Sequence, residues 1–394
     1  MLAVVSPTWP PERCGVADFA WWLAKSLGDH RVIRVFTREA GSPVPESVPA
    51  DSITMESMPR DWDFCGSRKL ARDLTRGGYH SILVHYSPFL YARRGIDPWM
   101  ALFLGSILSA ARPRSRPRPR LIVMFHEIFE PLHLGPRSFL RGSFQLVIAL
   151  AIGFLASDLV VASQERRTFL SRLLFWKRSR IHFIPVGSNI PVVAELEDRN
   201  SWRRKQGIEE DASVVAVFGL AHPSKNLQTM VDVLARLSRL KKSISLVAIG
   251  SVGAVIRNGI DRMSGLKFVD LGFLDAESVS RALAAADVVC LPYVDGVSTR
   301  RTTFMACLAH GIPVVTTFGY NTEEALRTSG ACEGVDPEDV DGMVEALTRI
   351  LEDPQQARDL GQRGARLYAE RFSWEKIGAE FQQLLTEAPG GTAP

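Results

Sequence analysis

The chain has 394 residues, of which 46% are hydrophobic and 23% charged, a composition typical of a folded globular protein. Its 47 basic and 43 acidic side chains leave a formal net charge of only +4, so there is no overall electrostatic case for nucleic-acid binding. Any anion site must therefore be local. At about 150 residues per domain, the length predicts two or three domains.

The five cysteines show no CxxC or Cys/His ligand spacing, and we interpret them as reduced core thiols, which predicts a cytoplasmic protein. Residues 1–10 lack the basic region and long apolar run of a signal peptide, which predicts a strand that begins at once. The most apolar stretch, residues 144–156, is shorter than the ~20 residues that span a bilayer. We expect a buried helix there.

Short β-branched runs alternate with helical patterns in the first half of the chain, as in the helix predicted at residues 16–27. Strands are predicted at residues 2–6, 31–36, 81–86, 120–126, 158–163 and 180–186. The proline-rich run 112–120 predicts an extended surface loop, because proline interrupts helices. With Trp99 and Phe103, residues 99–120 are a candidate for peripheral contact with an anionic membrane. A solvated connector is the alternative.

The second half repeats this alternation, with helices predicted at residues 226–240 and 275–286. Its strands are predicted at residues 213–219, 244–250, 266–273, 287–293 and 312–319. Buried strands alternating with helices indicate parallel sheets covered on both faces. We therefore predict an α/β fold of two Rossmann-like domains that face each other across a cleft. The expected boundaries are residues 1–187, 188–371 and a terminal helix and tail at 372–394.

Gly15 lies in the loop between the first predicted strand and its helix. Backbone N–H groups at such a helix start favour anions, and a glycine lets a ligand approach the backbone closely. Gly15 is therefore a candidate ligand contact, with an ordinary turn glycine as the alternative. Neither this loop nor residues 250–259 contains a GxGxxG fingerprint, so no dinucleotide cofactor is predicted.

The second half carries a stronger anion-binding pattern. Lys225 follows the first strand at a predicted helix start, where a lysine adds a flexible charge for a phosphate. A second predicted helix, which ends at Gly311, carries four hydroxyls and two guanidiniums in its first turn. These are Ser298, Thr299, Arg300, Arg301, Thr302 and Thr303. They form a cradle suited to a diphosphate, whereas the alternative is ordinary N-caps beside exposed arginines.

Several of these segments together resemble a GT-B-fold glycosyltransferase, most closely the retaining family 4 enzymes. The resemblance lies in the order and spacing of segments along nearly the whole chain. Those segments are residues 6–27, 184–189, 219–227, 283–293 and 309–317. Residues 371–385 resemble the C-terminal helix that crosses back onto the N-terminal domain in such enzymes.

The resemblance implies transfer of a glycosyl group from a nucleoside-diphosphate sugar to a hydroxyl acceptor, with retention of configuration and no metal or other cofactor. The acceptor class stays open between a saccharide, a lipid-linked sugar and a small molecule. Lys225, Arg300 and Arg301 would stabilise the charge that grows on the leaving diphosphate. A cytoplasmic enzyme is expected, and a peripheral location at the inner face of the membrane stays open as an alternative.

The N-terminal domain is expected to hold the acceptor and the donor sugar. The resemblance places His126, beside Glu127 at a strand end, at the donor sugar or its phosphate, and a half-buried histidine bonded to backbone is the alternative. Asp18 and His85 are weaker candidates for acceptor contact. Residues 61–63, DWD, match a metal-binding DxD pattern, but their surroundings predict a loop before a helix, and we assign no metal there.

The chain departs from the family pattern at its acidic positions. Two glutamates that family 4 enzymes usually carry eight positions apart are replaced by Ser298 and Ala306, and a usual arginine by Leu220. Arg300 or Arg301 would then supply the missing cation.

We hypothesise that Glu323 or Glu324, just after the last predicted strand, bonds the ribose instead. Two alternatives stay open because of the missing glutamates. One is a catalytically inactive relative that binds a nucleotide sugar or a partner, and the other is a GT-B epimerase or phosphorylase.

Overall fold

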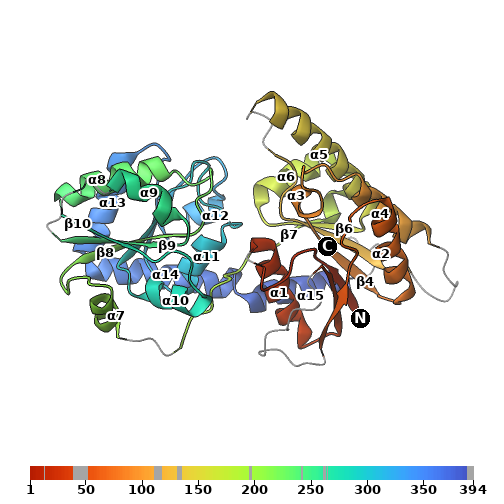
Figure 1. Cartoon of the computed structure of the whole chain (residues 1–394), viewed down its shortest axis with the longest axis horizontal. Coiled ribbons are helices and arrows are strands. Elements are labelled where there is room, and N and C mark those ends of the chain that lie inside the picture. Colours follow the sequence, from red (N-terminus) through yellow and green to blue (C-terminus); the bar gives the residue numbers. More distant parts are fainter. Residues whose placement is uncertain are drawn as a thin grey trace. The chain divides into compact units, whose positions relative to one another are not determined.

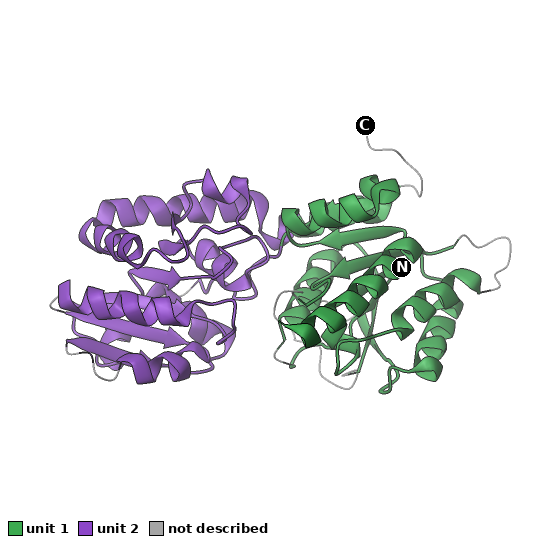
Figure 2. Ribbon diagram, turned by 90° about the horizontal axis from the view of Figure 1, so that it is seen from above, with its two compact units in different colours: residues 1–185, 377–394 green, residues 186–376 purple. Residues whose placement is uncertain are grey.

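The structure, a computed structural model, describes residues 1–12, 14–38, 52–110, 118–130, 135–194, 198–240, 243–260, 263 and 265–387. The chain folds into two compact units, each with its own parallel sheet and core (Figure 1). Unit 1 comprises Met1–Pro185 and Ile377–Pro394, and unit 2 comprises Val186–Lys376 (Figure 2). The C-terminal segment thus belongs to the same unit as the N-terminus.

Unit 1 is built on a seven-stranded parallel sheet in the order β3-β2-β1-β4-β5-β6-β7. Its strands are β1 (Leu2–Val5), β2 (Ile33–Thr37), β3 (Ile53–Ser57), β4 (Ser81–Tyr86), β5 (Arg120–Phe125), β6 (Asp158–Val161) and β7 (Ile181–Phe183). Its helices are α1 (Gly15–Gly28), α2 (Phe64–Arg76), α3 (Pro88–Tyr91), α4 (Trp99–Ser109), α5 (Pro136–Leu155), α6 (Gln164–Leu173) and the 3₁₀ helix η2 (Phe175–Arg180), together with most of α15 (Trp374–Thr386). Every residue of β1, β4 and β5 is buried, as parallel strands covered on both faces require.

Unit 2 has a six-stranded parallel sheet in the order β10-β9-β8-β11-β12-β13. Its strands are β8 (Ser213–Phe218), β9 (Ile244–Ile249), β10 (Leu266–Asp270), β11 (Val288–Leu291), β12 (Val314–Thr317) and β13 (Glu333–Val335). Its helices are α7 (Arg199–Lys205), α8 (Leu227–Leu240), α9 (Val252–Ile260), α10 (Ala276–Ala284), α11 (Thr302–Ala309), α12 (Glu324–Arg327), α13 (Val340–Glu352) and α14 (Pro354–Arg371).

The predicted α/β architecture of two Rossmann-like sheets is confirmed. Two edge strands, β3 and β13, were not predicted from the sequence, because neither carries a continuous apolar run: only Ile53 of β3 is buried, and β13 has no fully buried residue. In each sheet the strand order reverses at one point, between β1 and β4 in unit 1 and between β8 and β11 in unit 2. Ligands of such sheets bind beyond the carboxyl ends of the strands at this switch point.

The helix expected at residues 144–156 forms as part of α5, but the expectation that it is buried is wrong. Helix α5 is long and apolar enough to cross a membrane by length and composition alone, and only 33% of its most apolar window is buried. Phe144, Val147 and Phe154 are 57%, 63% and 71% exposed. Only one side of α5 packs against unit 1, so an apolar sequence did not imply burial here.

The membrane contact predicted at residues 99–120 stays a prediction. Residues 111–117 lie outside the described residues, and the predicted loop is therefore largely untested. Phe103 is fully buried in the core of unit 1, together with Met100, Leu104 and Ile107 of the same helix. These four side chains of α4 are thus used for packing, whereas Trp99 is only partly buried.

Arg120 forms a buried ion pair within unit 1 and also holds the end of α15. Nε of Arg120 donates to Asp158 at 2.5 Å, and the two side chains are 5% and 0% exposed. The same guanidinium donates to the backbone carbonyls of Leu384 and Glu387. Burial alone raises the pKa of Asp158, but hydrogen bonds from His182 and Arg120 lower it to about 2. Asp158 is therefore a carboxylate at neutral pH, and its buried negative charge is stabilised by these two partners.

We expect Arg120→Leu to lower the free energy of unfolding by ~3–5 kcal/mol, because it leaves the Asp158 carboxylate buried beside too few positive partners. The matched control is Arg34→Leu, which breaks the pair with Glu56, in which both side chains are more than 40% exposed. That change is expected to remove less than about 1 kcal/mol. Urea denaturation followed by circular dichroism measures both, and equal losses would contradict the assignment.

Candidate functional site

In unit 2, Gly219 and Lys225 follow β8 at the switch point. The backbone of Lys225 forms an antiparallel bridge with Tyr293, which follows β11, and its Nζ donates to the carbonyl of Phe218. Gly219 has φ +116°, and a Cβ there would lie 2.5 Å from Nζ of Lys225 and 2.8 Å from Cγ2 of Thr303. A glycine is therefore required, because both side chains pack directly on this backbone.

Lys225 is a half-buried cation whose charge responds to its surroundings. Its Nζ lies 6.0 Å from the centre of the Tyr293 ring. Burial lowers the pKa of Lys225 to about 8; nearby Cys307 acts in the opposite direction, and Arg301 lowers the pKa further. The side chain is thus mostly an ammonium at pH 7. An anionic ligand would stabilise that charged form.

The predicted cradle is not a single helical turn as expected. Helix α11 begins at Thr302 with Arg301 as its N-cap, so Ser298, Thr299 and Arg300 lie in the preceding loop. Glu323 holds that loop, because its carboxylate accepts from the backbone N of Thr299 at 3.1 Å and from its Oγ1 at 2.6 Å. This contact satisfies backbone and hydroxyl groups that the sequence pattern had assigned to a helix start.

Asp295 organises the cationic side of this loop, and the sequence analysis missed it. Its carboxylate accepts from Nη2 of Arg301 at 2.5 Å, from Nη2 of Arg300 at 3.1 Å and from Nδ2 of Asn321 at 2.8 Å. Burial raises the pKa of Asp295, but Arg301, Asn321 and Arg300 together hold it below the ordinary value. The signal available in the sequence was its place in the loop after β11, immediately before Gly296.

Arg301 is the most constrained cation of the group. Besides Asp295, it donates to Oγ of Ser224 at 2.8 Å, and its guanidinium lies 4.5 Å above the Tyr293 ring. Its Nε and the Oγ of Ser298 are buried and have no hydrogen-bond partner among the described residues. Two unsatisfied polar atoms on one loop are a cost that a bound polar ligand would remove.

Of the remaining predicted site residues, Thr302 and Thr303 lie beside the cradle and Glu324 does not. Oγ1 of Thr303 lies 2.8 Å from the hydroxyl of Tyr293, and Thr302 begins α11, so both stay beside the cradle. Glu324 is exposed, unlike Glu323. At the positions of the missing family residues, Leu220 is 59% exposed and Ala306 is fully buried. The structure therefore gathers Lys225 and the Ser298–Thr303 segment with Glu323, and leaves Glu324 apart.

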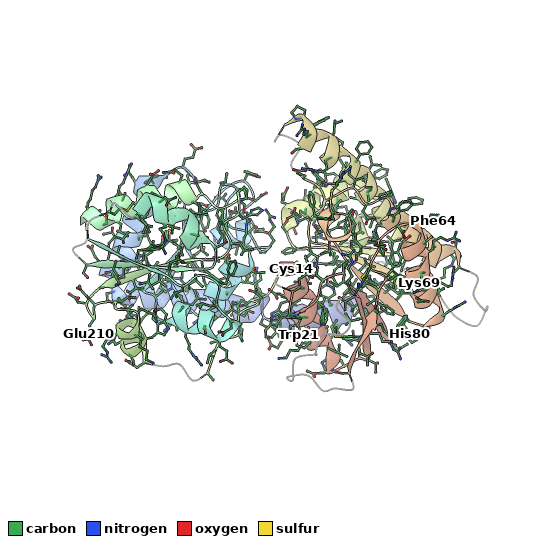
Figure 3. The ribbon with its side chains drawn as sticks, in the orientation of Figure 1. Cys14, Trp21, Phe64, Lys69, His80 and Glu210 are labelled. Carbon is green, nitrogen blue, oxygen red and sulfur yellow. The ribbon has the colours of Figure 1, made fainter. Side chains whose placement is uncertain are left out.

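In unit 1, Gly15 begins α1 directly after Cys14, the N-cap, which is labelled in Figure 3. A Cβ added to Gly15 would meet no atom within 4 Å. The space beside this helix start is therefore open, as a ligand contact requires. The predicted role of Gly15 stays a prediction.

His126 and His85 form a pair at the carboxyl ends of β5 and β4. Nε2 of His126 lies 3.0 Å from Nδ1 of His85, the rings stack at 5.2 Å, and Phe19 packs its edge against both. Burial lowers the pKa of His85 to about 3. Burial, His85 and Arg166 lower the pKa of His126 well below its ordinary value. Both imidazoles are therefore neutral at pH 7, and one donates to the other.

The direction of this hydrogen bond follows from the far nitrogen of His85. Nε2 of His85 is buried without a partner among the described residues. A buried N–H without an acceptor is rarer than a buried acceptor without a donor. We infer that His85 carries its proton on Nδ1 and donates to Nε2 of His126, so that His126 carries its own proton on Nδ1. His126 then presents a hydrogen-bond donor.

We expect the pair to make stability depend on pH. An unfolded histidine takes a proton near pH 6.5, whereas folded His85 takes one only near pH 3, so stability falls as pH falls between these values. From pH 7.5 to 5.0, His85 should account for a loss of about 2 kcal/mol. The His85→Asn variant should lose about 2 kcal/mol less stability than the wild type between pH 7.5 and 5.0. The control His30→Asn replaces an exposed histidine and should lose as much stability as the wild type. Urea denaturation at both pH values measures this, and an unchanged pH dependence in His85→Asn would refute the buried neutral pair.

The DWD segment has a structural role. The Asp63 carboxylate caps α2 by accepting from the backbone N of Gly66 at 2.7 Å, and Nε1 of Trp62 donates to Asp97 at 2.8 Å. Among the described residues, no group of three or more His, Cys, Asp or Glu side chains is arranged to hold a metal ion.

The chain is similar to a family of glycosyl transferases and to two mannosyltransferases. Residues 198–367 match the family described as glycosyl transferases group 1. A GDP-mannose-dependent monoacylated alpha-(1-6)-phosphatidylinositol monomannoside mannosyltransferase of Corynebacterium glutamicum is 26% identical over 50% of this chain and 53% of its own length. An MMP alpha-(1->4)-mannosyltransferase of Mycolicibacterium hassiacum is 27% identical over 51% of this chain and 47% of its own length. The chain thus spans about half the length of these curated relatives.

A solved structure is similar in fold to nearly the whole chain. Anabaena HepE, in a crystal structure with UDP and glucose, matches 98% of this chain and 99% of its own with a TM-score of 0.71 and 15% identity. At this identity the likeness concerns the fold. It extends over both units.

Proposed function

We propose that the chain is a member of the glycosyl transferases group 1 family, whose model matches residues 198–367, and that it transfers a sugar from a nucleoside-diphosphate sugar to a hydroxyl acceptor with retention of configuration. The observation that carries this proposal is the cationic group at the switch point of unit 2. Lys225 and Arg301 lie against the same tyrosine ring, at the ends of the two strands where a parallel sheet binds ligands.

In the proposed reaction the bond from the sugar C1 to the diphosphate oxygen breaks, and a bond from C1 to the acceptor oxygen forms on the same face. The acceptor proton goes to the leaving phosphate oxygen, so that no carboxylate base is needed. Lys225, Arg300 and Arg301 stabilise the charge that grows on the diphosphate. The guanidiniums are already oriented by Asp295, so little reorganisation accompanies the reaction.

A lipid-linked sugar is the acceptor class that we propose. Its support is the relative from Corynebacterium glutamicum, whose name specifies a phosphatidylinositol monomannoside. The inactive alternative rests on Ser298 and Ala306, which replace glutamates. Against it stand the half-buried cations Lys225 and Arg301, which lie together on the Tyr293 ring beside the unsatisfied Nε of Arg301 and Oγ of Ser298, an arrangement that a bound anion would stabilise.

We expect Lys225→Ala, and Arg300→Ala combined with Arg301→Ala, each to lower turnover by about 100-fold or more, the scale of losing a preorganised charge contact. Transfer from a panel of labelled nucleotide sugars to lipid acceptors is measured in excess EDTA, and the anomeric configuration of the product is read by NMR. Arg349→Ala, a half-exposed arginine elsewhere in unit 2, is the control. Wild-type turnover in both site variants would reject the cradle, and an inverted product would reject retention.

The adjacent pair Glu323 and Glu324 offers a matched comparison. Glu323 holds the Thr299 loop, while Glu324 is exposed. We expect Glu323→Gln to raise the KM for the donor several-fold with a smaller effect on kcat, because a neutral amide binds the backbone N–H and hydroxyl of Thr299 less strongly. Glu324→Gln should leave both constants unchanged. If both variants behave as wild type, Glu323 has no part in donor binding.

A further inference from the structure

Helix α5 carries an exposed apolar stripe that the proposed function does not use. Leu140, Phe144, Val147 and Phe154 recur at helical spacing, so they lie on one side of the helix. They are 57% to 71% exposed, and Phe139 beside them is 53% exposed. In Figure 3, side chains extend outward along α5. A soluble protein does not ordinarily expose so many large apolar side chains on one helix.

The stripe continues onto η2. Nζ of Lys177, in η2, donates to the carbonyls of Gly153 and Phe154 at 2.7 and 3.2 Å, which holds η2 against the end of α5. Phe175 and Trp176 are next to this lysine and are 73% and 57% exposed. We call the exposed side chains of Phe139, Leu140, Phe144, Val147, Phe154, Phe175 and Trp176 the α5–η2 face.

Basic residues outnumber acidic ones along this segment, although Arg141, Arg166 and Arg180 form ion pairs with Glu130, Glu127 and Asp158. Residues 136–180 contain eight arginines and lysines but only two acidic residues, Asp158 and Glu165. Asp158 is fully buried and paired, so it contributes no negative charge at the surface. Arg172 and Arg178, close in sequence to Phe175 and Trp176, are exposed. Apolar side chains next to basic ones are the chemistry that binds an anionic lipid surface.

The contacts of the buried side of α5 are incompatible with a helix that spans the membrane. Gln145 is fully buried, accepts from the backbone N of Glu130 at 2.6 Å and donates to the carbonyl of Gly95 at 3.0 Å. Ala149 and Ile152 pack in the core of unit 1. Crossing a bilayer would break these contacts, whereas lying flat on it would keep them.

We propose that the α5–η2 face binds the interface of an anionic phospholipid bilayer, with α5 parallel to the membrane plane. The apolar side chains enter the acyl boundary and the arginines contact lipid phosphates. Binding by this face does not require glycosyl transfer, so it is measured independently of the proposed function.

The test is co-sedimentation of the full chain with vesicles of phosphatidylcholine, with or without 30 mol% phosphatidylglycerol. We expect binding to the anionic vesicles, reduced roughly 100-fold in the triple variant Phe144→Ser, Phe154→Ser, Trp176→Ser. Arg172→Gln with Arg178→Gln should reduce it roughly tenfold or more. Because all five side chains are exposed, the variants should keep the wild-type thermal melt.

Two control variants are matched to these changes. Val255→Ser removes an apolar side chain that is 53% exposed on α9 of unit 2, whereas Val147→Ser removes one that is 63% exposed on the α5–η2 face and should weaken vesicle binding. Arg72→Gln with Arg76→Gln removes the same charge from exposed positions of α2. Neither control should change vesicle binding.

Three outcomes would overturn the proposal. These are no sedimentation with anionic vesicles, equal binding by the wild type and the triple variant, or equal losses in the charge variant and its control. A wild-type dimer in vesicle-free buffer that the triple variant dissociates would instead assign the face to a second copy of the chain.

Discussion

The carboxylate of Asp295 is the contact on which the candidate donor site depends. Arg300 and Arg301 follow one another in sequence, and two neighbouring guanidiniums repel each other unless an anion lies between them. Asp295 provides that anion from a position on the same loop. The loop can therefore fold with its cations already oriented before a diphosphate arrives. Without this partner, Arg301 would be largely buried as an uncompensated charge, which proteins seldom tolerate.

The two units use the same sheet architecture, but the strand ends of unit 2 carry positive charge whereas the histidines at those of unit 1 are neutral. In unit 2 the switch point carries Lys225 and the arginine loop, so it favours anions. In unit 1 the strand ends carry His85 and His126, which burial keeps neutral. A neutral imidazole donates a hydrogen bond without adding charge, which suits contact with uncharged sugar hydroxyls. The common fold therefore does not determine the chemistry, and the side chains at the strand ends do.

Helix α5 shows how an apolar sequence can serve two purposes. Its inner side is committed to the core through Ala149 and Ile152, and its outer side remains exposed. The core of unit 1 is complete without the outer side, so the exposed phenylalanines do not serve the stability of the folded chain in water. Their retention next to exposed arginines is best explained by a surface outside the protein.

The sequence by itself determined the two parallel sheets, because continuous apolar runs such as β4 and β9 need cover on both faces. It also located Lys225 and the Ser298–Thr303 segment, since strand ends and helix starts are recognisable from local pattern. Only the tertiary structure decided that α11 begins at Thr302, that Asp295 pairs with both arginines, and that His85 lies against His126 from 41 positions away. It alone also decided which side of α5 is buried. These features are contacts between side chains from different loops and strands. Local sequence propensities do not predict such contacts, because they form only when the strands pair.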